Sequence, residues 1–149
     1  MERCPECGAE WPDGQTCQGL FDEFLVWEFQ DPAYGAVHFL TVAVFMTQHG
    51  RYTDAGQAWI RDKLHENLVE GASVEWIRRA AQEPTSQAKR TWKVVREAGD
   101  PPAKRIPWEM TIVDVNRAHD EAGLEAAAYR AAVTEWARTT LRQLDAEGL

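Results

Sequence analysis

Three cysteines near the start of the chain have the spacing of a metal site. Cys4 and Cys7 form a Cys-x-x-Cys pair followed by Gly8, and Cys17 is the third and last cysteine. This arrangement is typical of a zinc knuckle, because two thiolates on one tight turn can hold one ion. Pro5 favours the turn, and Gly8 allows the positive φ that follows it. We expect Zn²⁺, with iron as the alternative ion.

A tetrahedral site needs a fourth ligand, which must be a histidine, an acid or water. Cys17 precedes a helical pattern that ends at Asp31-Pro32, and a second helical pattern follows. Two antiparallel helices of roughly 20 Å each return His49 to the level of Cys17, whereas His38 lies roughly 16 Å from His49 along the second helix. One ion therefore cannot bind both histidines. We predict as ligands Cys4, Cys7, Cys17 and His49, with His38 as the alternative fourth ligand.

The predicted ligand set favours a structural metal. A catalytic zinc keeps an open position, whereas three cysteines and one histidine fill the tetrahedron. A redox-active Cys-x-x-Cys pair normally starts a helix after a strand, which is not the context here. Three buried cysteines without metal are the remaining alternative. A sensor that releases the N-terminal segment when the ion leaves is a further option.

His38 requires an interpretation of its own. It is expected within a buried helix, opposite Glu23, Trp27 or Glu28, and a buried histidine is usually satisfied by a carboxylate or a carbonyl. The alternative is a general base or a second metal ligand in a tryptophan-lined pocket, with Glu28, His65 or His119 as partner. No His-x-x-x-His or Glu-x-x-His motif links these histidines, which favours the first interpretation. His38 and Glu28 are the candidate catalytic residues.

Charge and hydropathy limit the partners. The 149 residues carry a net charge of −8, and cationic contacts dominate nucleic-acid binding, so we expect no nucleic-acid partner. The longest apolar stretch, Ala36–Met46, is too short to span a bilayer, so we expect no membrane partner. Residues 1–16 lack the apolar run of a signal peptide, which favours a cytoplasmic location.

The pattern of apolar residues predicts one all-α domain over residues 1–149, a bundle of five or six helices. Residues 1–17 form an irregular metal-binding head. Residues 83–110 contain four prolines and form an irregular strap, a lid or a partner arm, with short extended chain over 91–95. Helices are predicted over residues 20–30, 32–48, 54–70, 74–82, from 111 onward, and 124–144.

Capping signals mark three of the expected helix starts. Asp54 with Gln57 reads as a capping box, Ser73 is a cap, and Thr111-x-x-Asp114 is a second box. In the helix over 74–82 we expect three inward residues, Trp76, Ile77 and Ala80. In the last helix the inward residues are expected to be Tyr129, Val133, Trp136, Ala137, Thr140, Leu141 and Leu144.

Several motifs resemble those of a bacterial family of small proteins of unknown function. Members carry CPxCG, a later cysteine, DPAYGxVHxLTV and a QHP-like motif, and the chain has CPECG, DPAYGAVHFLTV and TQHG. MTIVDV and VTEWA resemble two weaker motifs near the C-terminus. The chain has Gly50 where the family often has proline, which is expected only to loosen a helix end. The resemblance implies no activity, and it points to Cys4, Cys7, Cys17, His38 and His49.

The sequence thus predicts a zinc-binding helical protein whose metal is mainly structural. Its expected role is that of a binding or interaction module, as a homodimer or with a protein partner. The alternative is a small metal- or His-dependent enzyme with a pocket around His38 and Glu28. No feature of the sequence names a substrate.

Overall fold

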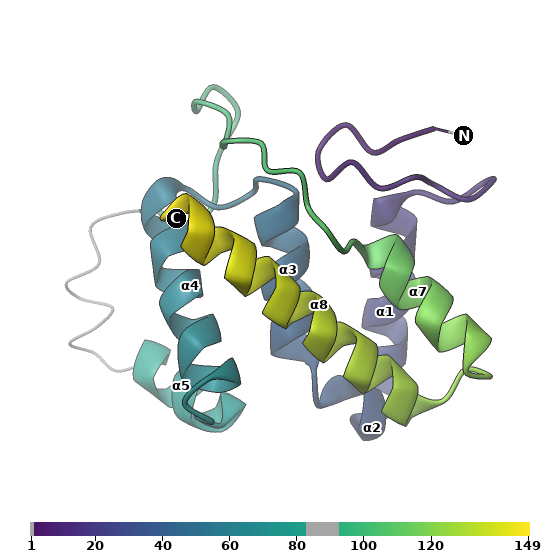
Figure 1. Ribbon diagram of the computed structural model, residues 1–149. Helices are drawn as coiled ribbons and strands as arrows, with labels where there is room; N and C mark the ends of the chain where they lie inside the picture. The colour runs from purple at the N-terminus through teal and green to yellow at the C-terminus, as the bar shows by residue number, and fades with distance from the viewer. Residues whose placement is uncertain (1, 83–92) are drawn as a thin grey trace.

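The computed structural model describes residues 2–82 and 93–149, which fold into an all-α protein (Figure 1). Within these ranges, β structure is limited to two isolated bridges, between Arg3 and Glu10 and between Tyr52 and Val95. The all-α prediction is confirmed. The helices are α1 (Cys17–Gln30), α2 (Pro32–Gly35), α3 (His38–Gln48), α4 (Asp54–Leu68), α5 (Val74–Gln82), α7 (Ile112–Glu121) and α8 (Ala126–Glu147).

Helix α8 is the element against which most others pack. It runs diagonally across the front of the molecule in Figure 1 and contacts α2, α3, α4 and α7. Its inward stripe has the 3.6-residue period of a helix that buries one face. All seven residues predicted to face inward on this helix are buried: Tyr129, Val133, Trp136, Ala137, Thr140, Leu141 and Leu144.

The start of α8 differs from its prediction. Leu124 was expected to open the helix, but its φ is 64°, and Gly123 before it has a φ of 77°. These left-handed residues turn the chain between α7 and α8, so helical geometry begins only at Ala126.

The prediction of one continuous helix over residues 32–48 is wrong, because the chain forms α2 and α3 with a break between them. At the break Val37 has φ −105° and ψ 13°, outside the helical region. Gly35 passes directly against α1, and a Cβ there would lie 2.7 Å from the Glu28 carbonyl oxygen. Only glycine allows this approach. As a result His38 stands at the first position of α3 rather than inside a longer helix.

Helix α4 is capped by a residue that the sequence pattern did not indicate. Thr53, and not Asp54, is the N-cap, and its hydroxyl accepts a hydrogen bond from the Gly56 N–H at 3.0 Å. The predicted capping box with Gln57 is wrong, because the Gln57 amide donates to Thr47 at 3.1 Å instead. Aspartate is on average a somewhat better N-cap than threonine, so residue type alone favours the wrong one of these two neighbours.

The other two predicted caps are confirmed. The Ser73 hydroxyl accepts from the Trp76 N–H at 3.1 Å at the start of α5. The Thr111 N–H donates to the Asp114 carboxylate at 2.8 Å at the start of α7. On α5, Ile77 is buried as predicted, whereas Trp76 is 53 % exposed, contrary to its prediction. The side chain of Ala80 lies outside the described part of the chain.

The strap is described only from Lys93 onward, so the predicted extended run at residues 91–92 lies outside the described residues. Residues 93–110 contain no helix and cross the top of the bundle in Figure 1 before entering α7. The strap is fixed at Val94, whose carbonyl accepts from the Thr53 N–H at 2.9 Å. A Cβ at Gly56 would meet that carbonyl oxygen at 2.3 Å, so this contact requires glycine.

None of the described helices combines the length and apolar character needed to cross a bilayer.

Candidate metal centre

The N-terminal head places two cysteines on one tight turn. The Cys4 N–H donates to the Ala9 carbonyl at 2.8 Å, and the Gly8 N–H donates to the Cys4 carbonyl at 3.0 Å. Gly8 has a φ of 82°, a conformation that favours glycine. The Cys7 N–H points at the Cys4 sulfur, 3.5 Å away. This is the local geometry of a zinc knuckle, in which backbone N–H groups face the sulfurs.

Helices α1 and α3 bring two further side chains to this turn. Cys17 is the first residue of α1, and His49 is the C-cap of α3. The ligand atoms of Cys4, Cys7, Cys17 and His49 all lie within 4.8 Å of one another, and each residue is at most 5 % exposed. The Cys7 and Cys17 sulfurs are 3.6 Å apart. Sulfurs in a tetrahedral zinc site with bonds of about 2.3 Å are separated by about 3.8 Å, so the spacing suits such an ion.

The imidazole of His49 is held in the orientation that a metal ligand requires. Its Nδ1–H donates to the Phe45 carbonyl at 2.7 Å, and its ring stacks on the Phe45 ring with centroids 4.1 Å apart. The other nitrogen, Nε2, is buried and has no hydrogen-bond partner among the described residues. Buried polar atoms are rarely left unpaired, and a backbone carbonyl on the far nitrogen is the usual support of a histidine ligand.

Trp11 also belongs to this cluster, although the sequence reasoning missed it. Its indole N–H donates to the Cys17 sulfur at 3.1 Å. The hydrogen bonds from Cys7 and Trp11, together with the neighbouring His49 side chain, lower the pKa of Cys17 to about 4, despite burial. In that pair Cys7 keeps its proton, and its pKa is raised by the bond to Cys17 and by burial. The sequence offered one signal for this contact: an indole N–H that is partly shielded from water needs an acceptor, and Cys17 lies six residues away.

Two arginines attach the head to the rest of the molecule. Arg51, just after α3, binds the Glu6 carboxylate through two nitrogens, at 3.0 and 3.1 Å. This hydrogen-bonded pairing lowers the pKa of Glu6. Arg105 of the strap donates to the Pro5 carbonyl. The turn that carries the cysteines is therefore joined to both α3 and the strap.

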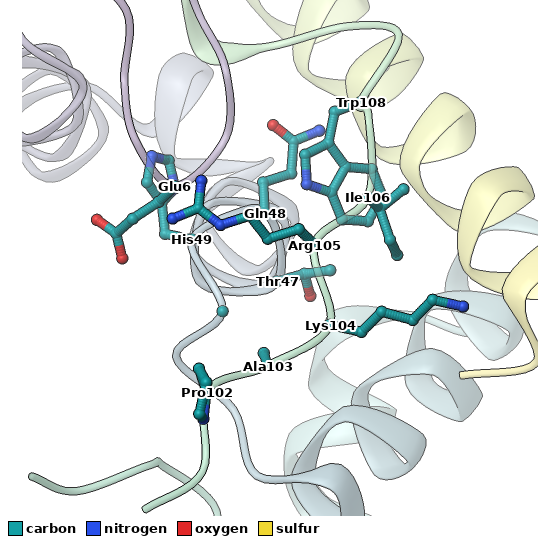
Figure 2. A pocket seen from close by; sticks show the side chains of 11 residues that line it. Glu6, Thr47, Gln48, His49, Pro102, Ala103, Lys104, Arg105, Ile106 and Trp108 are labelled. Atoms are coloured by element: carbon teal, nitrogen blue, oxygen red, sulfur yellow. The ribbon is translucent and has the colours of Figure 1, made fainter. Parts of the chain in front are cut away.

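A cavity of about 230 Å³ with both polar and apolar walls adjoins this cluster (Figure 2). Figure 2 shows its walls coming from the head, from the end of α3 and from the strap, with Trp108 and Ile106 opposite Glu6. Gln48 is fixed in its wall, since its amide donates to the Met110 carbonyl at 2.8 Å and to Thr140 at 2.9 Å. Three segments distant in sequence thus meet beside His49.

His38 lies outside the metal cluster and has a different partner. Its Nδ1 is 2.7 Å from Oε1 of Glu28, whose side chain is fully buried. Oε2 of the same carboxylate accepts from Thr41 and from Tyr129, both at 2.5 Å. Burial and the neighbouring Glu28 raise the pKa of Tyr129, so its hydroxyl keeps the proton that it donates. Pairing of His38 with a carboxylate agrees with the expected structural role, and the sequence did not indicate Thr41 or Tyr129 as partners.

Neither of the other two histidines hydrogen-bonds to His38 or Glu28 within the described structure. His65 pairs with Asp145 at 2.8 Å on the partly exposed side of α4. His119 is buried in α7, and its Nε2 lies 2.7 Å from the Tyr34 hydroxyl. That hydroxyl donates to the Leu124 carbonyl at 2.9 Å, so His119 must be the donor to Tyr34. Burial lowers the pKa of His119.

A comparison with known protein families matches residues 2–145 of this chain to one family model, described as a family of unknown function (DUF5946). No curated protein and no solved structure matches the chain. The match covers nearly the whole chain, including the head that holds the three cysteines, the helices and the strap. The chain therefore belongs to the DUF5946 family of unknown function.

Proposed function

We propose that the protein is a zinc-stabilised helical binding module. One Zn²⁺ is held by Cys4, Cys7, Cys17 and His49, and it joins the irregular head to the ends of α1 and α3. The ion has a structural role, and the protein acts through the surface and cavities of the folded chain. Reduced thiolates suit a reducing compartment, which is the reason for proposing a cytoplasmic location.

The observation that carries the proposal is the unpaired Nε2 of His49. This nitrogen is buried beside three cysteine side chains, and none of the described residues gives it a hydrogen-bond donor. A neutral imidazole with Nδ1–H on a carbonyl presents a lone pair at Nε2, which a metal ion would accept. The same ion would take the thiolates, since zinc binds sulfur and nitrogen.

The ligand set supports a structural role over chemistry at the metal. Three sulfurs and one nitrogen complete the four positions of tetrahedral zinc, so no position is left for water or substrate. The head, residues 2–16, contains no helix and is too short for a core of its own. Segments of this kind commonly depend on a metal for their folded structure.

A protein partner is the second element of the proposal. Phe29 is 78 % exposed and Val26 is 50 % exposed, and both lie on α1. Their spacing of three residues places them on one face of the helix, where they form a small apolar surface. We propose that this surface contacts a protein, with a second copy of the chain as the simplest case. Sedimentation of the wild type and of Phe29→Ser tests it: the variant is expected to lose association, and equal association of both would contradict it.

Metal analysis of matched variants tests the ligand set. The wild type, purified from zinc-supplemented cells, is expected to carry about one zinc per chain. His49→Ala should lose most of this metal, because it removes the only nitrogen of the cluster. His38→Ala is the matched control on the same helix, and it should retain the metal. Loss of zinc from His38→Ala with retention in His49→Ala would overturn the assignment.

A further inference from the structure

A second cavity, of about 370 Å³, is lined by the first part of α3, whereas the cavity beside the metal cluster is lined by the end of that helix. Side chains of α3, α4 and α5 line it, together with Tyr52 and with Val94 of the strap. Its walls are largely apolar and include Phe39, Val42, Trp59, Ile77 and Val94. Small-molecule sites are commonly apolar concavities of about 300–1,000 Å³ with a few placed polar groups. This cavity has that size and that composition.

His38 contributes an imidazole to the wall of this cavity, and Glu28 fixes the orientation of that ring. Its Nδ1–H donates to Glu28, which is fixed by Thr41 and Tyr129. A carboxylate accepts this proton whether the ring is neutral or protonated, so Nε2 is the nitrogen that remains for a ligand. No hydrogen bond among the described residues uses Nε2, and the His38 side chain is 37 % exposed.

The charged groups of the lining favour an anion. His38 and Arg78 are the two lining residues that can carry positive charge, and no aspartate or glutamate is among the described residues of the wall. This contrasts with the chain as a whole, whose net charge is −8. Tyr52 also lines the cavity, and burial raises the pKa of its hydroxyl, so the side chain adds no negative charge.

We propose that this cavity is a binding site for a small apolar carboxylic acid. In the complex the His38 ring is doubly protonated, so that Nδ1–H donates to Glu28 and Nε2–H donates to the ligand carboxylate. The Arg78 guanidinium also donates to this carboxylate, and the hydrocarbon part packs against the apolar walls. Glu28 is a positioning residue that orients the His38 ring. The proposal is independent of the metal, since none of the four proposed ligands lines this cavity.

Isothermal titration of the full chain with three probes of equal length tests the ligand class. Octanoate, octanol and octylamine share one hydrocarbon tail and differ in the head group. Octanoate is expected to bind at about one molecule per chain, at least about tenfold more tightly than the other two, because charged hydrogen bonds are the stronger ones. No octanoate binding, or equal binding of octanol or octylamine, would overturn the proposal.

Four variants locate the site. His38→Gln should weaken octanoate binding about tenfold and leave octanol binding unchanged. Glu28→Gln should weaken octanoate binding less than this and should also leave octanol binding unchanged. General damage to the cavity would instead weaken the binding of both probes, so the pair of probes identifies a positioning effect. Val42→Trp fills the cavity and should abolish binding of both probes. His65→Gln, a histidine paired with a carboxylate elsewhere, is the control. Octanoate binding unchanged in both His38→Gln and Val42→Trp would exclude this cavity as the site.

Discussion

Two histidines lie at opposite ends of α3, and their different environments suit them to different roles. His38 begins the helix and His49 caps its end. Each has Nδ1 fixed at 2.7 Å, His38 by the Glu28 carboxylate and His49 by the Phe45 carbonyl. The difference lies at Nε2. In His49 this nitrogen is buried among three cysteines, whereas the His38 ring borders an apolar cavity and is partly exposed.

A fixed Nδ1 does not by itself assign a function to either histidine. A carbonyl behind the ring is neutral and leaves the imidazole a good donor to a cation. A carboxylate as the acceptor of Nδ1–H supplies negative charge. That charge stabilises a protonated imidazole, which can bind an anion. The groups around Nε2 of each ring then select the ligand. The sulfurs beside His49 favour a metal ion, and the apolar walls beside His38 favour an organic molecule.

The largest expected effect is that of metal removal. A strong chelator should lower the free energy of unfolding by several kcal/mol, on the order of 5, because metal binding and folding of the head are coupled. Residues 2–16 should lose protection in hydrogen exchange, while α8 remains protected. His38→Gln should respond to the chelator as the wild type does. Unchanged thermal unfolding and unchanged exchange of the head after metal removal would contradict the structural role.

The second effect concerns the Glu28 network at the other end of α3. Glu28→Ala leaves the buried partners Thr41 and Tyr129 without their acceptor and should cost about 3–5 kcal/mol. Glu28→Gln retains an acceptor oxygen and should cost less, about 1–2 kcal/mol. Urea unfolding measures both. Zinc content should remain that of the wild type in each variant, and a loss of zinc would show that the two ends of α3 are not independent.

A smaller effect is expected at Trp11. Trp11→Phe keeps the ring but removes the N–H that donates to the Cys17 sulfur. Loss of such a supporting hydrogen bond commonly costs about 10–100-fold in metal affinity. Competition with a chromophoric chelator measures the change, and the helical circular dichroism of the zinc-loaded variant should stay unchanged. An affinity equal to that of the wild type would mean that the indole serves packing alone.

The smallest effect is expected for the ion pair between Arg51 and Glu6. Both side chains are about 40 % exposed. Exposed pairs contribute about 0.2–1 kcal/mol, so Arg51→Ala should change the unfolding free energy by no more than that and should leave zinc bound. A loss of several kcal/mol in urea unfolding would assign to the ion pair the role that we give to the metal.

The all-α class and the inward face of α8 could be predicted from periodicity because a helix that buries one face repeats its apolar residues every 3.6 positions. The nearness of His49 to Cys17 followed from helix lengths and an antiparallel turn. The split between α2 and α3 could not be predicted. It depends on the approach of Gly35 to the Glu28 carbonyl, which is a tertiary contact.

Partners contributed by distant segments were also beyond sequence reasoning. Tyr129 was expected to face inward, but its hydrogen bond to Glu28 spans 101 positions and depends on how α8 crosses α1. Trp76 was expected to be buried by its period within α5, yet it is exposed because no described element covers that face. Periodicity identifies a face of a helix, and the packing of other elements decides which face is covered.

X-ray absorption at the zinc edge of the purified full-length protein tests the central claim most directly. We predict a first shell of about three sulfurs at about 2.3 Å and one nitrogen at about 2.0 Å. The nitrogen contribution should disappear in His49→Ala and persist in His38→Ala. A shell with oxygen or nitrogen in place of a sulfur, or a spectrum that His49→Ala leaves unchanged, would contradict a closed site made of Cys4, Cys7, Cys17 and His49.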